Sequence, residues 1–405
     1  MEYLFTERAH LMCPRMYFGI VVNVKAAFDE AQVRTAFSAL AKGHPFLRAL
    51  LGYEEKSGRY FYDVTGASQT EILIKEQETP SADDPAVMAE YEHLTNAEWD
   101  LFSEGMLKAA VWKSGENTCF SLVFHHLLAD GRGALTLSQE LADCYARDAV
   151  PKYAPERLIS SAGDFPKGSG LPLISRMLID KANRDWKKER HAPVSYRRYR
   201  DCANQFLRED RVQYSLKKLD RAEVEETVRQ CREQGVTVND LLMARMYMRE
   251  NTDKIIIAHD LRQQLAFFIP GALGNYATAF SVVMKKKKGD EFALAREIHR
   301  KVRKIISSPA QLYLVLQCYA RLEPGLIDAA FMAARGGYES KAAAFIGSTF
   351  FGFSASKGYS ITNLGRIENS SIETAYFIPP ASPAIRMTQG VLTVNGEMTV
   401  CTSGR

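Results

Sequence analysis

His125-His126-Leu127-Leu128-Ala129-Asp130-Gly131 joins two stretches of different periodicity and decides how the first half of the chain folds. Before it, Phe120, Leu122 and Phe124 share one face at a period of two, which predicts a largely buried strand over residues 119–124. After it, apolar residues at positions 134, 137, 141 and 145 recur at helical spacing. The seven residues are therefore predicted to form a loop between a strand and a helix.

The chemistry of this loop is restricted by its geometry. Adjacent residues of an extended chain point to opposite faces, so one of His125 and His126 can serve a site while the other supports it. Gly131 permits the tight backbone reversal that leads into the helix. A metal site would need His126 and Asp130 on one helix turn, which the preceding strand disfavours, so we expect no metal. A buried structural histidine pair followed by a helix-capping aspartate is the simpler alternative.

His125-His126-x-x-x-Asp130-Gly131 resembles the HHxxxDG signature of the acyltransferase superfamily that includes chloramphenicol acetyltransferase, nonribosomal peptide condensation domains and alcohol acyltransferases. Further stretches resemble that family in the same order, from about residue 42 to about residue 365. These stretches are Lys42-Gly43-His44-Pro45-Phe46-Leu47-Arg48, Val236-Thr237-Val238-Asn239-Asp240-Leu241-Leu242, Asp260-Leu261-Arg262, Leu273-Gly274-Asn275-Tyr276 and Thr362-Asn363-Leu364-Gly365. The Asp-Phe-Gly-Trp-Gly element of plant members is absent, so the pattern is closest to stand-alone microbial alcohol acyltransferases.

The resemblance implies an α/β fold of two chloramphenicol-acetyltransferase-like lobes, each a mixed sheet flanked by helices, with a tunnel between them. It also implies acyl transfer from a thioester, either acyl-coenzyme A or an acyl carrier protein, to a small-molecule alcohol, with no acyl-enzyme and no permanently bound cofactor. An imidazole of ordinary pKa ~6.5 suits proton removal near neutral pH, and His126 is the expected general base. Two alternatives remain open: amide formation on an amine acceptor with a carrier-bound donor, and a catalytically silent relative that binds small molecules or partners.

Other site residues follow from the same resemblance. In relatives the motif aspartate pairs with an arginine, so we predict a salt bridge between Asp130 and Arg262 that fixes the loop, supported by His125 and Gly131. Thr362 and Asn363 match residues near the tunnel and are candidate oxyanion donors, although an asparagine bonded to its own backbone turn is equally ordinary. Asn275 is a further tunnel candidate, but a structural loop residue is the favoured interpretation.

The remaining histidines have no matching constellation around them. His44 is expected to be a turn residue outside the chemistry. Surface or core packing is the expectation for the other five, which are His10, His93, His191, His259 and His299.

Length and composition agree with a two-domain globular protein. The chain has 405 residues, 46% of them hydrophobic and 25% charged. We predict an N-terminal lobe over 1–165, a basic crossover linker over 166–204 and a C-terminal lobe over 205–405. A net charge of +4 gives no argument for nucleic acid binding, and no segment approaches the ~20 apolar residues that span a bilayer. Seven cysteines without a C-x-x-C pair favour reduced thiols, hence a cytoplasmic protein, and a monomer could build the whole site.

Two basic runs have no assigned role. Residues 176–201 hold nine Lys or Arg against four Asp or Glu. A solvated linker is the favoured interpretation, and contact with an anionic cofactor, a carrier protein or a membrane surface is the alternative. Residues 285–288 are four consecutive lysines, typical of a soluble turn, with coenzyme A phosphates as the alternative partner.

The periodicity also predicts the main elements. Strands are expected over 16–24, 59–64, 107–113, 211–216, 254–259 and 278–284, with short closing strands near the end. Helices are expected over 30–40, capped by Asp29, and within 222–250 and 291–334. Asn395-Gly396 predicts the turn of a terminal hairpin.

Overall fold

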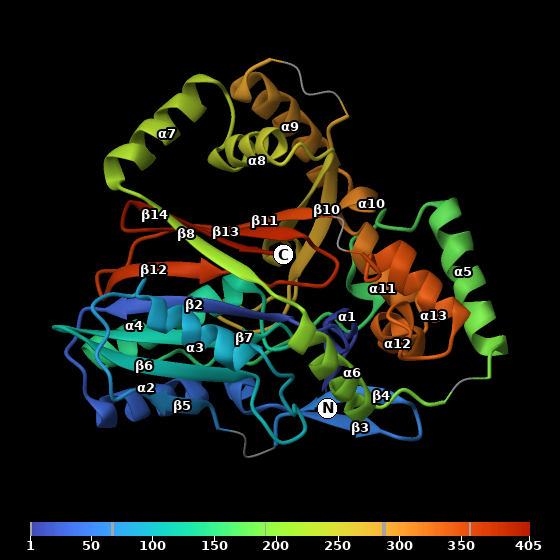
Figure 1. The fold of residues 1–405 in the computed structure, drawn as a ribbon, viewed down its shortest axis with the longest axis horizontal. Coiled ribbons are helices and arrows are strands. Elements are labelled where there is room, and N and C mark those ends of the chain that lie inside the picture. Colours follow the sequence, from blue (N-terminus) through green and yellow to red (C-terminus); the bar gives the residue numbers. More distant parts are fainter. Residues whose placement is uncertain (1, 66–68, 191, 286–288, 356–357) are drawn as a thin grey trace.

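Two large sheets organise the computed structural model, which describes residues 2–65, 69–190, 192–285, 289–355 and 358–405 (Figure 1). The first sheet has five strands in the order β12 (Ile372–Ile378), β2 (Tyr17–Val24), β7 (Asn117–His125), β6 (Leu107–Ser114) and β5 (Glu71–Ile74). The second has six, in the order β10 (Ala277–Val283), β9 (Lys254–Asp260), β11 (Tyr359–Ile367), β13 (Met387–Val394), β14 (Glu397–Gly404) and β8 (Gln213–Leu219). The expected two-lobed mixed α/β fold is confirmed.

The first sheet carries the histidine motif at the end of a buried strand. Phe120, Leu122 and Phe124 of β7 are all buried, as the alternating pattern predicts. Antiparallel pairing sets Tyr17 of β2 opposite His125, so the motif begins where β7 leaves the sheet. A small third sheet, β1 (Glu2–Tyr3), β4 (Arg59–Asp63) and β3 (Leu50–Glu54), lies to one side of it (Figure 1).

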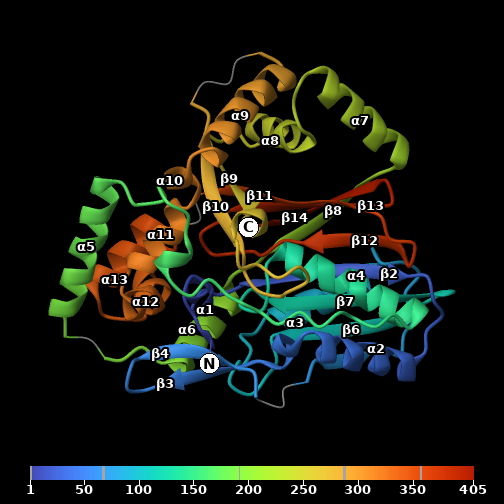
Figure 2. The same ribbon diagram turned by 180° about the vertical axis from the view of Figure 1, so that it is seen from behind.

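Helices cover the outer faces of both sheets. α2 (Glu30–Gly43) and α4 (Gly131–Arg147) pack together on one face of the first sheet, and α3 (Pro85–Thr95) lies on the other face (Figure 2). α7 (Arg221–Glu233), α8 (Val238–Arg249) and α9 (Glu291–Ile306) cover the second sheet (Figure 1). Asp29 accepts a hydrogen bond from the Gln32 amide, which confirms the predicted cap of α2.

A third group of helices was not predicted as a unit. The expected linker segment 166–204 forms α5 (Leu173–Lys188) and the start of α6 (Tyr196–Glu209). α5 lies at the outer edge of the molecule in both views, beside α11 (Leu314–Arg321), α12 (Pro324–Ala334) and α13 (Lys341–Phe345) (Figures 1 and 2). The short helices α1 (Arg8–Leu11) and α10 (Pro309–Leu312) complete the set.

Strand β12 connects the two halves of the chain. It lies late in the sequence, yet it pairs antiparallel with β2 of the first sheet, while β11 and β13 on either side of it in sequence belong to the second sheet. The terminal hairpin turns at Asn395 and Gly396, both at positive φ, as predicted. In the described part of the chain, no helix has both the length and the apolar character that crossing a bilayer requires.

Candidate active site

His126 lies at the first residue beyond β7, half-buried between elements from both sheets. Its backbone amide donates to the Met16 carbonyl at 2.8 Å, which fixes the start of the loop. Its ring Nδ1 lies 3.3 Å from Nδ2 of Asn275, and Phe18 meets the ring edge-on with centroids 5.2 Å apart. No described residue hydrogen bonds to Nε2, so this nitrogen is the one available to a reactant.

The proton affinity of His126 is reduced by its surroundings. Burial lowers its pKa below the ordinary value of 6.5, against an opposing hydrogen bond from the ring to its own backbone carbonyl and the nearby charge of Asp130. The ring is therefore neutral at pH 7, which is the form that a general base requires.

His125 takes the supporting position, on the opposite side of the chain. Its ring is buried edge-to-face against Tyr17, with centroids 5.1 Å apart, and its Nδ1 accepts from the Leu127 amide at 3.2 Å. Burial, together with the charge of His126, lowers its pKa to about 3. A permanently neutral acceptor at this point holds the turn after β7.

Asp130 connects α4 to the second half of the chain. One carboxylate oxygen accepts from the Gly133 amide at 2.9 Å, which caps α4. The carboxylate also receives both guanidinium nitrogens of Arg262 at 2.8 and 2.9 Å and the Tyr276 amide at 2.8 Å. The predicted salt bridge between Asp130 and Arg262 is present, and the same carboxylate also caps α4, as the simpler alternative expected.

The loop that leads into β10 brings Asn275 to the histidine. The Asp130 amide donates to the Gly274 carbonyl at 3.1 Å, so the two loops are bonded in both directions. Asn275 is buried, and its Oδ1 accepts weakly from the Ala277 amide at 3.4 Å, which leaves Nδ2 facing the His126 ring. Asn275 is a loop residue, as the favoured interpretation expects, but its contact with the His126 ring is not predicted from the sequence.

Residues 362–365 belong to β11 and lie against the start of α4. Leu364 packs directly on Gly131, where an added Cβ would come within 2.7 Å of the Leu364 side chain. Arg132 donates to the Leu364 carbonyl, which ties the two elements together. Asn363 is exposed and accepts from the Gly365 amide at 2.8 Å, which is the turn alternative raised above, while Thr362 is half-buried.

His10 was not anticipated at the site. Its ring stacks on that of His126, with centroids 4.5 Å apart and an angle of 23° between the planes. Burial, then repulsion from His126 and His125, lowers its pKa well below the ordinary value. The sequence does not predict this contact, because α1 brings a distant part of the sequence over the motif.

The three histidines do not form a metal centre. No group of three or more histidine, cysteine or acidic side chains among the described residues is arranged to hold a metal ion. His44 instead bonds Glu140 from its turn, and the described cysteines are all free thiols.

Comparison with known proteins places the chain in a family. The model of the Condensation domain family matches residues 16–257, more than half of the chain. A curated relative, "Cyclosporin synthetase simA" of Tolypocladium inflatum, is 29% identical over 132 residues, which cover 32% of this chain and 1% of that protein. The chain therefore belongs to the Condensation domain family, while it matches only a very small part of that relative.

Solved structures agree on the fold. The polyketide synthase associated protein 5 from Mycobacterium tuberculosis superposes with a TM-score of 0.59 at 15% identity, covering 100% of this chain and 92% of that one. The epimerization domain of tyrocidine synthetase B superposes with a TM-score of 0.60 at 14% identity, covering 96% and 86%. At these low identities the superpositions show a shared architecture.

Proposed function

We propose that the chain moves an acyl group from a thioester to an alcohol, with His126 as the general base. The observation that carries the proposal is the half-buried, neutral imidazole whose Nδ1 faces Asn275 and whose Nε2 has no partner among the described residues. The donor is acyl-coenzyme A or the thioester of an acyl carrier protein, and no cofactor is permanently bound.

The chemistry needs one proton carrier. The step requires the neutral tautomer whose proton is on Nδ1, so that Nε2 keeps its lone pair. Nε2 then removes the proton of the acceptor hydroxyl as its oxygen attacks the thioester carbonyl carbon, forming a tetrahedral oxyanion. When the intermediate collapses, the carbon–sulfur bond breaks and the imidazolium returns the proton to the departing thiolate. The products are an ester and a free thiol, and no bond to the protein forms.

Each surrounding residue has a distinct role in this proposal. Asn275 lies against the Nδ1 side of the ring, the hydrogen bond between the ring and its own backbone carbonyl orients the imidazole, and the Asp130–Arg262 pair holds the loop at a distance from the reacting atoms. Thr362 is the proposed hydroxyl donor to the oxyanion, with Asn363 less suited because its amide oxygen is bonded to its own turn. A tunnel that opens to His126 from two sides belongs to the proposal, as do a monomeric state and a cytoplasmic location.

Amide formation is the second candidate, supported by family membership and by the similarity to a segment of "Cyclosporin synthetase simA". An amine acceptor would use the same base, since its nitrogen also loses a proton after attack. A silent relative is less well supported, because a binder would need neither an exposed imidazole nitrogen nor the ion pair that fixes its loop.

The test is a screen of acyl-coenzyme A and carrier-bound donors against mixed alcohols and amines, with thiol release and product mass as readouts. His126→Ala should abolish thiol release, while His93→Ala, at an exposed site on α3, should retain it. An ester product supports the first proposal and an amide the second. Turnover that survives in His126→Ala, with the fold intact by circular dichroism, would overturn the assigned base.

A further inference from the structure

Helix α5 exposes a ridge of four aliphatic side chains, which we call the α5 ridge. Leu173, Ile174, Met177 and Leu178 are 64%, 74%, 62% and 52% exposed. The helix packs on the protein through its opposite face, where Ile179, Ala182 and Trp186 are buried. Single exposed apolar residues are ordinary on a protein surface, but four neighbours on one helix mark an interaction site.

The same outward face becomes cationic along the helix. Arg184 and Lys188 follow the ridge at helical spacing, and neither they nor Arg176 form an ion pair with any described residue. The two acidic residues of α5 are already engaged: Asp180 pairs with Arg321 at 2.7 Å and Asp185 with Lys181. With five basic and two acidic side chains over residues 173–188, α5 carries a net positive charge beside the ridge.

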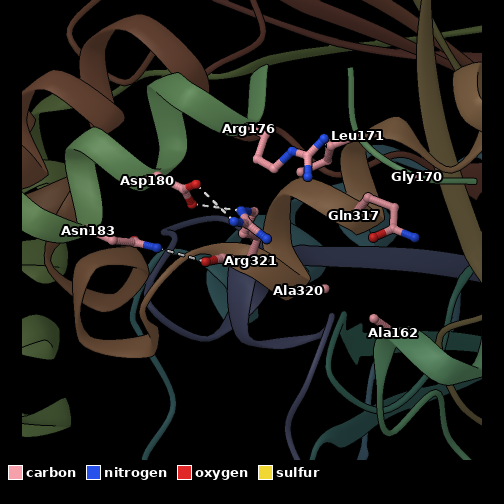
Figure 3. A pocket seen from close by; sticks show the side chains of 9 residues that line it. All are labelled: Ala162, Gly170, Leu171, Arg176, Asp180, Asn183, Gln317, Ala320 and Arg321. Atoms are coloured by element: carbon pink, nitrogen blue, oxygen red, sulfur yellow. Dashed lines mark hydrogen bonds and ion pairs between the residues drawn. The ribbon is translucent and has the colours of Figure 1, made fainter. Parts of the chain in front are cut away.

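Two hollows flank α5. One, of about 580 Å³, lies between α5 and α11, and Figure 3 shows the guanidinium groups of Arg176 and Arg321 together with Gln317 around it. The other, of about 630 Å³, lies between α5 and α13 and is lined by Leu178 and Phe345 with lysines at its edge. Phe345 is itself 47% exposed, so the apolar surface continues beyond the helix.

We propose that this face docks the protein on the surface of an anionic lipid bilayer. The α5 ridge enters the boundary between headgroups and acyl chains, while Arg176, Arg184 and Lys188 contact lipid phosphates. Interfacial helices combine apolar insertion with basic residues in this way, and each cation near an anionic surface adds to the attraction. The proposal uses none of the residues around His126 and stands independently of the acyl transfer proposed above.

Shape and charge favour a bilayer over other occupants. α5 lies at the outer edge of the molecule in both ribbon views (Figures 1 and 2), and all four side chains of the α5 ridge are exposed. A symmetric contact with a second copy would place the same patch of cations against itself. The four inserted side chains are aliphatic, and the cations lie around them, which is the arrangement of an interfacial helix at an anionic bilayer.

The experiment is vesicle flotation with the full chain. Vesicles of phosphatidylcholine alone are compared with vesicles containing 30% phosphatidylglycerol, roughly the charge density at which polybasic surfaces bind. We expect binding to the anionic vesicles, weak binding to neutral ones, and release as salt screens the charge. Ile174→Asp/Met177→Asp and Arg184→Glu/Lys188→Glu should each reduce the bound fraction at least about tenfold, since each removes one of the two contributions.

Matched control variants distinguish binding through this surface from non-specific binding to vesicles. Val150→Asp/Tyr153→Asp changes two exposed apolar residues elsewhere, and Arg300→Glu/Lys304→Glu reverses two exposed cations on α9. Both control variants and His126→Ala should bind as the unchanged protein does. Equal binding to both vesicle types, no binding to either, or retention by the α5 variants would overturn the proposal. The proposal would also be overturned if the unchanged protein did not bind vesicles and instead used this face for a protein contact. That contact would be a dimer seen by light scattering, or a complex with an acidic partner protein, and it would be lost only in the α5 variants.

Discussion

The protonation of His126 is determined by its burial. In the folded chain the pKa of the ring is lowered, so the neutral form persists as the pH falls below the ordinary value of 6.5. We therefore expect kcat/KM to stay level from pH 8 to 6.5 and to decline only at lower pH, as the ring finally gains a proton. A ring titration by NMR on the free protein gives the same midpoint without a substrate. A midpoint above 6.5 by either method would contradict this account.

The ring of His10 stacks on that of His126 and shields one of its faces from water. Removing it in His10→Ala would admit water to the His126 ring and relieve its burial, so the pKa of His126 should rise and kcat should fall about tenfold or more through loss of ring positioning. His10→Phe keeps a flat ring and should restore most of kcat. Equal activity of His10→Ala and the unchanged protein, with an unchanged His126 titration, would assign His10 to packing alone.

The sequence predicts some of these residues and not others for a definite reason. The sequence predicts the salt bridge between Asp130 and Arg262, because the family resemblance assigns a residue identity to each of the two positions. His10 has no such match, and its stacking depends on the path of α1, which has four residues and no periodic signal. Asn275 was a candidate, but its contact with Nδ1 of His126 is a property of the folded loop rather than of the tripeptide around it.

At the scale of elements, the Asp130–Arg262 pair joins α4 to the connection between β9 and β10. Both side chains are largely buried, so Arg262→Ala should leave an uncompensated carboxylate and cost ~3 to 5 kcal/mol of unfolding free energy. Asp130→Asn keeps a helix cap but loses the charge, and it should lower turnover by displacing His126. The measurements are denaturant unfolding and thiol release for both single variants and the double variant.

The double variant provides the control for this prediction. If the two residues act through their contact, the combined loss will be smaller than the sum of the single losses. Additive losses, or full turnover in a normally folded Asp130→Asn, would show that the pair does not fix the loop that presents the base.

Elements with strong periodicity were predicted, and those defined by tertiary contacts were not. β7, α4 and the terminal hairpin follow from alternation, helical spacing and an Asn-Gly turn. α5 follows a stretch rich in glycine and proline and is strongly basic, which indicated a linker over 166–204. The described residues of the lysine run end at Lys285, and residues 286–288 lie outside them, so the expectation for that run stays a prediction.

At the scale of the whole molecule, β12 prevents a simple division of the chain into two halves. The predicted boundaries assign residues 205–405 to one lobe, while β12 completes the sheet that begins with β2. No local pattern in 372–378 distinguishes a strand of one sheet from a strand of the other, because both sheets offer a buried apolar face. The pairing of β12 with β2 depends on the path that the chain takes between β11 and β13.

Buried carboxyl groups give the molecule a pH dependence that one substitution can isolate. Glu98 is buried beneath the site and accepts from the Tyr17 hydroxyl at 3.0 Å, and Tyr17 in turn contacts His125. Burial raises the pKa of Glu98 to about 7 from the ordinary 4.5. Between these two values the unfolded chain has lost this proton and the folded chain keeps it. Stability from this group is therefore complete below pH 4.5 and is lost as the pH rises through 7, at about 1.4 kcal/mol per unit.

Glu98→Gln is neutral at every pH and keeps an oxygen for the Tyr17 hydroxyl, so it should remove this loss. We expect the unfolding free energy of the variant, relative to the unchanged protein, to rise by roughly 3 kcal/mol between pH 4.5 and 7.5. Urea titrations at pH 4.5, 6.0 and 7.5 measure it. Glu7 and Glu156, whose pKa values burial also raises to about 7, are present in both proteins and cancel in the difference. A difference that does not change with pH would mean that Glu98 is already ionised in the fold, and that the buried surroundings of His125 tolerate a negative charge.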